Sequence, residues 1–459
     1  MKKRLLRSGL LLGALFLAAQ TSQAGGLMTN TNYHIAFDRM MARGASFDID
    51  AVYSNPAGLA WGHEGWQLSF NIQKPFQYRD IEASIPQPYA TAIGFEQHKF
   101  KGKASANPFV PALFASYKHD RWAFGFMAGI VGSGGKVKYD EGVPSFVVPV
   151  SGLLASNGVT PGAYTMDAFM EGKQYIYGIQ ANATYRINDH WAVAAGLRVN
   201  IYDGYNCGHV VATLNSPGVE LVNLQIDADQ RGAGVCPFLS VNYRLKRLVL
   251  TGRYEFRSKL NIPNDTKTLD AKIINPASLA TGAPSYLPQA AVLAQFGDKV
   301  APYMDGVKTR YDMPGLLSLA AGYEFIPNKL RGTLEYHWFD DKHAKMGGDR
   351  QETLTRGTHE FLAGVEWDIN ERFTVSLGGQ RTDYGISPEY QSNTSFACDS
   401  YSVGVGGAVN ITKHLRLNLG YFCSIYSNNS KDANYSGIPV TETYSRTNHV
   451  LGIGADYKF

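Results

Sequence analysis

The sequence has few cysteines, a modest share of charged residues and no long apolar segment. Its four cysteines among 459 residues do not have the spacing of a structural metal site. A membrane-spanning helix needs roughly 20 consecutive apolar residues, and the chain has no such run. Helical membrane spans are therefore excluded, whereas a β-barrel crosses a membrane without such runs.

The first 24 residues have the organisation of a secretory signal peptide. Four basic residues, at positions 2, 3, 4 and 7, precede a short apolar run from Gly9 to Ala19, and the small residues Ser22 and Ala24 follow. We expect cleavage after Ala24. The mature chain then has 39 basic and 39 acidic residues, so the sequence pI gives no reason to expect a nucleic-acid partner.

Export also makes disulfides chemically permissible for Cys207, Cys236, Cys398 and Cys423. A bridge between Cys207 and Cys236 is the pairing to test. Free thiols within strands are the alternative, and the sequence does not choose between them.

Glycine and tyrosine are abundant, with 48 and 27 copies, while charged residues make up 18% of the chain. Apolar and polar residues alternate over segments of about ten residues, which is the pattern of a transmembrane strand. Between Trp191 and Tyr202, for example, Leu197 and Val199 fall on one face while Arg198 and Asn200 fall on the other.

Fourteen such segments follow one another. Tight turns and longer connections alternate between them, as in a single-chain outer-membrane barrel whose even strand number returns both ends to the periplasm. Soluble β-sandwiches also alternate, but they lack this strict order of connections. The predicted strands span 65–74, 105–117, 121–131, 172–187, 190–204, 226–244, 247–259, 313–325, 329–341, 354–368, 371–384, 397–411, 414–428 and 441–459.

Tryptophans gather near the predicted strand ends, at positions 66, 122, 191, 338 and 367. This placement is typical of an aromatic girdle at the membrane interface. General β-propensity of aromatic residues is the alternative explanation.

Residues 25–64 precede the first strand and contain Ser54-Asn55-Pro56-Ala57-Gly58. The Asn-Pro-Ala motif at this position, before fourteen strands, resembles the FadL-type outer-membrane transporters of long-chain fatty acids and other hydrophobic compounds. The strand opening Pro314-Gly315-Leu316-Leu317 is also similar. The resemblance implies a fourteen-stranded barrel, residues 65–459, plugged by an N-terminal hatch, residues 25–64, in which Asn55, Pro56 and Ala57 help to seal the lumen.

The same resemblance implies a function and a location. It implies a monomer in the outer membrane of a Gram-negative bacterium, inserted by the barrel-assembly machinery, that takes up fatty acids or aromatic hydrocarbons passively, without a cofactor. Cargo would leave sideways through the barrel wall. The glycines of Gly132-Ser133-Gly134-Gly135, after the third predicted strand, would tolerate the bend that such an exit requires.

Two long outer connections, 132–171 and 260–312, carry apolar residues. In the second, Leu287, Val292, Leu293 and Phe296 fall on or beside one face of a short predicted helix. They are candidates for a groove that captures a hydrophobic ligand. The alternative is that they pack against Phe146, Val147, Val148 and Val150 of the first connection as a small core, and both descriptions can hold together.

Several charged residues are expected to face the lumen by strand parity. Among them, Arg198, Arg253 and Arg331 are candidates to bind a fatty-acid carboxylate through paired N–H donors. Pairing of these arginines with luminal carboxylates is the alternative.

An enzyme is the rival class, since barrel phospholipases and proteases exist. The eleven histidines show no metal-ligand spacing, and Gly134-Gly135-Lys136 lacks the other residues of a phosphate-binding loop. No Ser/His or Asp/His pair stands out either, so the sequence predicts no catalytic residues and no metal site.

The last residues alternate again, with Leu451, Ile453, Tyr457 and Phe459 on one face. This pattern predicts a final lipid-facing strand. Tyr457 and the terminal Phe459 resemble the signal by which the assembly machinery recognises barrel proteins.

Overall fold

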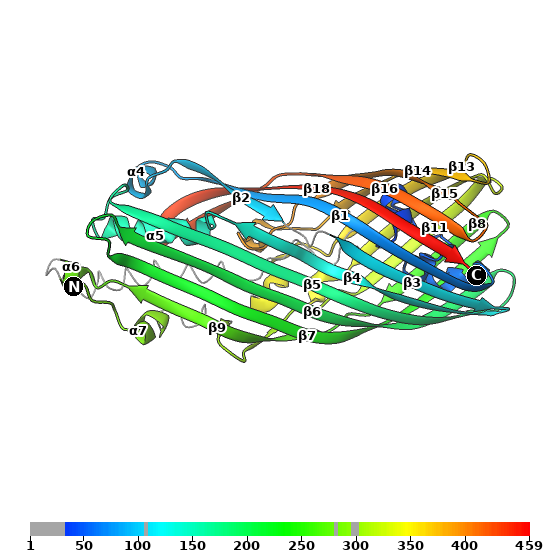
Figure 1. Cartoon of the computed structure of the whole chain (residues 1–459), viewed down its shortest axis with the longest axis horizontal. Helices are drawn as coiled ribbons and strands as arrows, with labels where there is room; N and C mark the ends of the chain where they lie inside the picture. Colours follow the sequence, from blue (N-terminus) through cyan, green and yellow to red (C-terminus); the bar gives the residue numbers. More distant parts are fainter. Residues whose placement is uncertain (1–32, 105–108, 280–282, 295–302) are drawn as a thin grey trace.

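The computed structural model describes residues 33–104, 109–279, 283–294 and 303–459. The predicted signal peptide, residues 1–24, lies outside the described residues, as does the first part of the predicted hatch. Figure 1 shows a long barrel with helices α4, α5, α6 and α7 at one end and the C-terminus at the other.

Fourteen antiparallel strands form the closed wall, which confirms the predicted fold class. Each pairs with the next along the chain, and β18 pairs with β1 from Gln67↔Lys458 to Ser84↔Thr441, which closes the barrel. The wall strands are β1 (Gly65–Ser84), β3 (Val110–His119), β4 (Trp122–Tyr139), β5 (Tyr164–Arg186), β6 (Trp191–Leu214), β7 (Glu220–Leu245), β8 (Leu248–Glu255), β11 (Leu316–Ile326), β12 (Leu330–Phe339), β13 (His359–Asp368), β14 (Phe373–Asp383), β15 (Ser400–Asn410), β16 (Leu415–Tyr426) and β18 (Ile438–Lys458).

Four further strands extend the wall beyond its outer end. They are β2 (Gln97–Ala104), β9 (Asn261–Ile273), β10 (Lys308–Arg310) and β17 (Asn429–Tyr435). With them lie α4 (Tyr89–Ile93), α5 (Pro144–Ser156), α6 (Pro276–Leu279) and α7 (Gln289–Ala294). Within the described residues, no helix is long and apolar enough to cross a membrane.

The sequence-based prediction was wrong about how far β1 and β4–β7 extend. Residues 132–139 and 164–171, predicted as loop, are strand, and β9 occupies residues 261–273 of the predicted loop 260–312. The outward faces of these extensions carry charged side chains such as Lys136, Lys138 and Asp167. A strand above the membrane needs no lipid-facing apolar row, so the alternation that identifies transmembrane strands is lost there.

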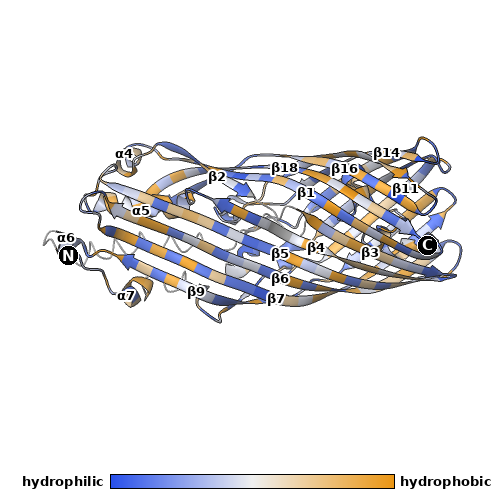
Figure 2. Ribbon diagram, viewed as in Figure 1, coloured by the Kyte–Doolittle hydropathy of each residue, from blue (hydrophilic) through white to orange (hydrophobic). Residues whose placement is uncertain are grey.

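Outward-facing side chains form an apolar band, whereas inward positions are polar or small. Exposed residues such as Leu197, Leu377 and Ile453 alternate with buried Arg198, Ser376 and Gly454. Figure 2 shows this alternation along the strands. A closed barrel with this outer surface is built to lie in lipid.

Aromatic side chains surround the end of the barrel that has the tight turns. Trp66, Trp122 and Trp191 are exposed and contact Tyr117, Tyr185 and Tyr243 across neighbouring strands, with ring centroids 4.9, 4.8 and 4.7 Å apart. Trp367 is exposed as well, while Trp338 lies at the opposite end of β12 and is half-buried. Three cross-strand aromatic pairs at one level fit the predicted interfacial girdle better than general β-propensity does.

All four cysteines lie in described residues, and all are free thiols. Cys207 faces Asp227 across the β6–β7 ladder, nine residues along β7 from Cys236. At 3.3 Å per residue the two thiols are about 30 Å apart along the strand, far beyond disulfide reach. The Cys207–Cys236 pairing considered from the sequence is therefore wrong.

Candidate functional site

Residues 33–64, hereafter the luminal segment, lie inside the barrel at the end with the tight turns (Figure 1). The segment contains α2 (Ile35–Met40), α3 (Ala51–Ser54) and the 3-10 helix η1 (Pro56–Trp61). α2 begins after His34, whose ring nitrogen accepts a hydrogen bond from Ala36 N, and ends at Met41 in the left-handed conformation. Every residue of α2 and α3 is buried.

Glycines of the wall form the surface on which α2 rests. A Cβ atom at Gly378 would lie 1.6 Å from the carbonyl oxygen of Met40, and one at Gly404 would lie 2.4 Å from that of Asp38. Cβ atoms at Gly364, Gly420 and Gly452 would lie 2.2, 2.8 and 2.4 Å from atoms of the same helix. Any larger residue would push α2 away, so the glycine-bearing inner faces of β13–β16 and β18 are shaped for this helix.

Buried ion pairs join the luminal segment to the wall and to itself. Arg39 pairs with Glu366 of β13, and Arg331 of β12 pairs with the same carboxylate. Within the segment, Arg43 Nε donates to Asp50 Oδ2 at 2.7 Å. A buried charge that loses its partner is strongly destabilising, so these pairs fix the position of the segment.

Wall side chains also bind the backbone of the luminal segment. Gln180 Nε2 donates to Val52 O at 2.7 Å, Thr184 Oγ1 donates to Pro56 O at 2.8 Å, and Gly44 N donates to Glu335 Oε2 at 2.7 Å. These bonds satisfy backbone groups that the short helices leave without partners.

The Asn-Pro-Ala motif shapes the turn between α3 and η1. Asn55 Nδ2 donates to Ser46 O at 3.0 Å, and Pro56 occupies the first position of η1, where its missing N–H costs nothing. Ala57 N donates to Ser240 Oγ of β7 at 3.4 Å. The motif therefore folds the segment back on itself and brings it against β7.

The three arginines predicted to contact a carboxylate lie beside the luminal segment, and each already has an acidic partner. Arg198 pairs with Glu255, and Arg253 Nη1 lies 3.3 Å from the same carboxylate and donates to Tyr53 O. Arg331 pairs with Glu366 and Asp368. Glu255 lies on the same strand as Arg253 and two strands away from Arg198, whereas Glu366 and Asp368 lie on the strand next to Arg331. Sequence parity does not reveal which residues on different strands meet.

An apolar cluster fills the barrel interior between the luminal segment and the outer end, and we call it the luminal cluster. Residues from the luminal segment, the wall and the outer connections contribute to it: Tyr33, Ile49, Ala51, Val52, Tyr53, Leu59, Ala112, Phe114, Ala123, Met127, Val131, Ile176, Tyr202, Leu260, Ile262, Tyr311, Met313, Met346, Leu354, Tyr390 and Ala397. Apolar side chains at this density are unusual in a barrel lumen, which is ordinarily polar.

Tyr390, a residue of the luminal cluster, contacts the side chain of Arg350 through both its ring and its backbone carbonyl. The Arg350 guanidinium lies 4.1 Å from the Tyr390 ring centroid, and its Nε donates to Tyr390 O at 2.7 Å. Burial lowers the pKa of Arg350 from its ordinary value.

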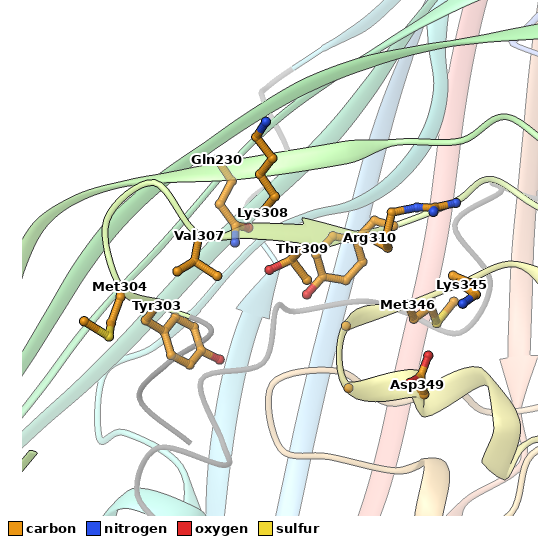
Figure 3. Close-up of a pocket in the computed structure, with 13 residues that line it drawn as sticks. Gln230, Tyr303, Met304, Val307, Lys308, Thr309, Arg310, Lys345, Met346 and Asp349 are labelled. Carbon is orange, nitrogen blue, oxygen red and sulfur yellow. The ribbon is translucent and has the colours of Figure 1, made fainter. Parts of the chain in front are cut away.

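A pocket of about 540 Å³ opens beside the luminal cluster. Figure 3 shows Tyr303, Val307 and Thr309 on one side of it and Met346 and Asp349 on the other. Lys308, Arg310 and Lys345 also line it, and Arg310 forms a bidentate pair with Asp312. The volume and the mixed lining suit a small molecule with apolar and polar parts.

The predicted capture residues of the outer connection lie in a second apolar cluster, hereafter the outer cluster. Val292 is buried there with Phe146, Val148 and Val150 of α5, and Leu287 and Leu293 pack against it. Phe296 lies outside the described residues. The small core considered from the sequence is therefore formed, and ligand capture on its surface stays a prediction.

Catalytic machinery is not evident in the described residues. They contain no group of three or more His, Cys, Asp or Glu side chains that could hold a metal ion. His337, which lies between Glu335 and Glu360, is engaged on both ring nitrogens.

The fold and the luminal segment define a class: a fourteen-stranded transmembrane barrel whose lumen is occupied by its own N-terminal region. Solved structures of FadL-type transporters have this fold. A Pseudomonas aeruginosa FadL homologue superposes with a TM-score of 0.65 at 15% identity, covering 95% of this chain and 100% of the other.

The Pseudomonas putida toluene transporter TodX gives a TM-score of 0.55 at 13% identity, with 95% and 100% of the two chains covered. The Ralstonia pickettii toluene transporter TbuX gives 0.51 at 12% identity, with 95% and 99% covered. No family model and no curated protein matches the sequence. The likeness is thus one of fold, and it extends over nearly the whole chain.

Proposed function

We propose that this protein is a passive outer-membrane channel for hydrophobic small molecules, with long-chain fatty acids as the leading cargo. The observation that carries the proposal is the apolar luminal cluster above a tightly held luminal segment. A water-filled porin needs a polar, open lumen. A lumen lined by apolar side chains favours cargo that leaves water readily.

In this account the luminal segment is a hatch. It occupies the barrel cross-section that fourteen strands are too wide to fill with their own side chains. Asn55, Pro56 and Ala57 keep its fold, and the glycine surface and buried ion pairs keep it in place. The hatch prevents leakage of ions while hydrophobic cargo enters from the outer cluster.

A lateral exit is supported by the backbone of β4. The β3–β4 ladder stops at Leu113↔Ala128, and the β2–β4 ladder resumes at Lys103↔Lys138. On its other edge, β4 has register shifts against β5 between Ile130 and Gly132 and between Ser133 and Gly135. Bulges of this kind bend a strand, here beside Val131 and Ile176 of the luminal cluster.

Neutral aromatic hydrocarbons are the second candidate cargo, because two of the structures with this fold are described as toluene transporters. A fatty acid carries a carboxylate head group, whereas an aromatic hydrocarbon has no polar group. Neither requires a cofactor or a catalytic residue.

Uptake by whole cells tests the proposal. A Gram-negative strain without its own hydrophobic-compound channel is made to express the full chain, and entry of labelled palmitate and labelled toluene is measured separately. Faster entry of either compound than in cells with the empty vector supports the proposal. Unchanged entry of both, with the barrel assembled in the outer membrane, contradicts it.

A further inference from the structure

The outward face of the barrel wall carries a groove of about 890 Å³ that extends across β8 and β11–β15. Its floor includes Ala363 of β13 and Gly379 of β14, which are direct cross-strand partners on the outward face. The next partners on either side, Leu334 of β12 and Val403 of β15, are large and exposed. Two small residues between larger ones leave the space of the groove.

A row of larger side chains borders the groove on the side of the outer connections. Tyr336, Phe361, Arg381 and Tyr401 are successive register partners across the neighbouring strands β12–β15, and all four line the groove. Figure 1 shows β13, β14 and β15 together in the wall. The groove is therefore apolar along its floor and has one cation at its outer end.

Arg381 lies at the outer edge of the apolar band of β14. From the tight turn onward, the outward positions of this strand are Phe373, Val375, Leu377 and Gly379, none of which carries a charge. Arg381 follows Phe373 by eight positions, which is about 26 Å along the tilted strand and comparable with an apolar band about 25 Å tall. The guanidinium therefore lies at the level of the outer head groups.

The Arg381 side chain is exposed, and its N–H donors are not used by the protein. Its guanidinium lies 4.8 Å from the ring centroid of Tyr401. Within the described ranges it makes no hydrogen bond, and no carboxylate oxygen lies within 4.0 Å of it. Asp383, two positions further along the same face, accepts a hydrogen bond from Arg356 at 2.6 Å. An external anion can therefore bind Arg381.

From this geometry we propose that the groove binds a lipopolysaccharide molecule, with a lipid A phosphate at Arg381 and an acyl chain along Ala363 and Gly379. Arginine binds phosphate through paired N–H donors. The groove descends from Arg381 toward the middle of the membrane, so its occupant has its head group on the outer side. The lipid of that leaflet in a Gram-negative outer membrane is lipopolysaccharide. The inference goes beyond hydrophobic uptake and uses only the proposed outer-membrane location.

Native mass spectrometry of the purified full-length barrel in mild detergent tests the site. Three probes are compared: lipid A with its phosphates, the same lipid A after removal of the phosphates, and phosphatidylglycerol. Wild type is expected to bind one copy of phosphorylated lipid A most tightly. Arg381→Gln is expected to weaken this binding about tenfold and to leave the dephosphorylated form unchanged, while Arg381→Lys keeps part of the preference.

Gly379→Leu tests the groove independently of the charge. Its side chain fills the floor on the outward face, so both forms of lipid A should bind more weakly. Arg372→Gln is the matched control, because Arg372 is also exposed and lies over an aromatic ring, that of Phe373 at 5.6 Å, but at the tight-turn end of β14. It should bind lipid A like wild type. Heat-dependent gel mobility shows that each variant is folded.

Each part of the proposal has an outcome that overturns it. Equal binding of the two forms of lipid A by wild type, or equal weakening in Arg381→Gln and Arg372→Gln, overturns the phosphate site. Unchanged lipid A binding by Gly379→Leu overturns the groove as the seat of the acyl chain. Phosphatidylglycerol bound as tightly as lipid A overturns the assignment to lipopolysaccharide. Hydrophobic uptake stands in every case, since the groove lies outside the lumen.

Discussion

Arg39 of the luminal segment forms an ion pair with Glu366 of β13, and both side chains are fully buried. Because Arg331 binds the same carboxylate and Arg43 lies 3.8 Å from it, one acidic group is close to three guanidinium groups, two of them from the luminal segment. The negative charge of Glu366 therefore stabilises three arginine side chains at once.

Glu366→Gln is expected to destabilise the seat of the hatch by about 3–5 kcal/mol, since it leaves buried guanidinium groups without their counter-charge. Ion conductance across planar bilayers is the measurement, and the variant should conduct where wild type does not. Asp229→Asn removes the acid of the exposed Lys267–Asp229 pair and serves as the control. A Glu366→Gln barrel as tight to ions as wild type would contradict this role.

The glycine surface gives a sharper steric test. Gly378→Ala places a Cβ atom 1.6 Å from Met40 O, so α2 must move and the barrel should leak ions. Gly379→Ala, one residue further on, meets nothing closer than 3.5 Å and should stay closed. Equal conductance of the two variants would show that α2 does not rest on this surface.

Filling the pocket should slow uptake without opening the barrel. Thr309→Trp introduces a large ring into the cavity of about 540 Å³ in Figure 3. Entry of labelled palmitate into cells is expected to fall several-fold, because the ring occupies space that cargo needs. Thr165→Trp on an exposed position of β5 controls for the added bulk. Undiminished uptake by Thr309→Trp would place the route elsewhere.

The C-terminal aromatic residue supports assembly in our account. Phe459 is exposed on the outer surface, and its backbone N–H donates to Trp66 O at 3.0 Å. Deleting Phe459 is expected to lower the amount of folded barrel in the outer membrane, measured by membrane fractionation. Phe459→Tyr keeps an aromatic ring and should assemble normally, and an equal loss in both variants would argue against recognition of the ring.

The sequence predicts the barrel well because lipid imposes a simple rule. Apolar residues must alternate outward wherever a strand crosses the bilayer, and rows such as Leu197, Val199 and Ile201 follow that rule. The strand extensions above the membrane do not follow this rule, because no lipid surrounds them. Lys138 and Asp167 face water there, so residues 132–139 and 164–171 were predicted as loop.

The contacts between side chains inside the barrel are much harder to predict from the sequence. The pairing of Arg198 with Glu255, or the opposition of Arg79 and Arg446, depends on which strands become neighbours and in what register. Parity shows only that a residue faces inward. The glycines beneath α2 are visible in the sequence, but their purpose appears only when Met40 and Asp38 are placed against them.

Mass spectrometry of molecules that co-purify with the barrel after extraction in mild detergent tests the central claim most directly. We expect a long-chain hydrophobic molecule, with a carboxylic acid as its main form, bound in about one copy per barrel. A barrel that carries no hydrophobic molecule, even after purification from cells supplied with fatty acids, would contradict the account.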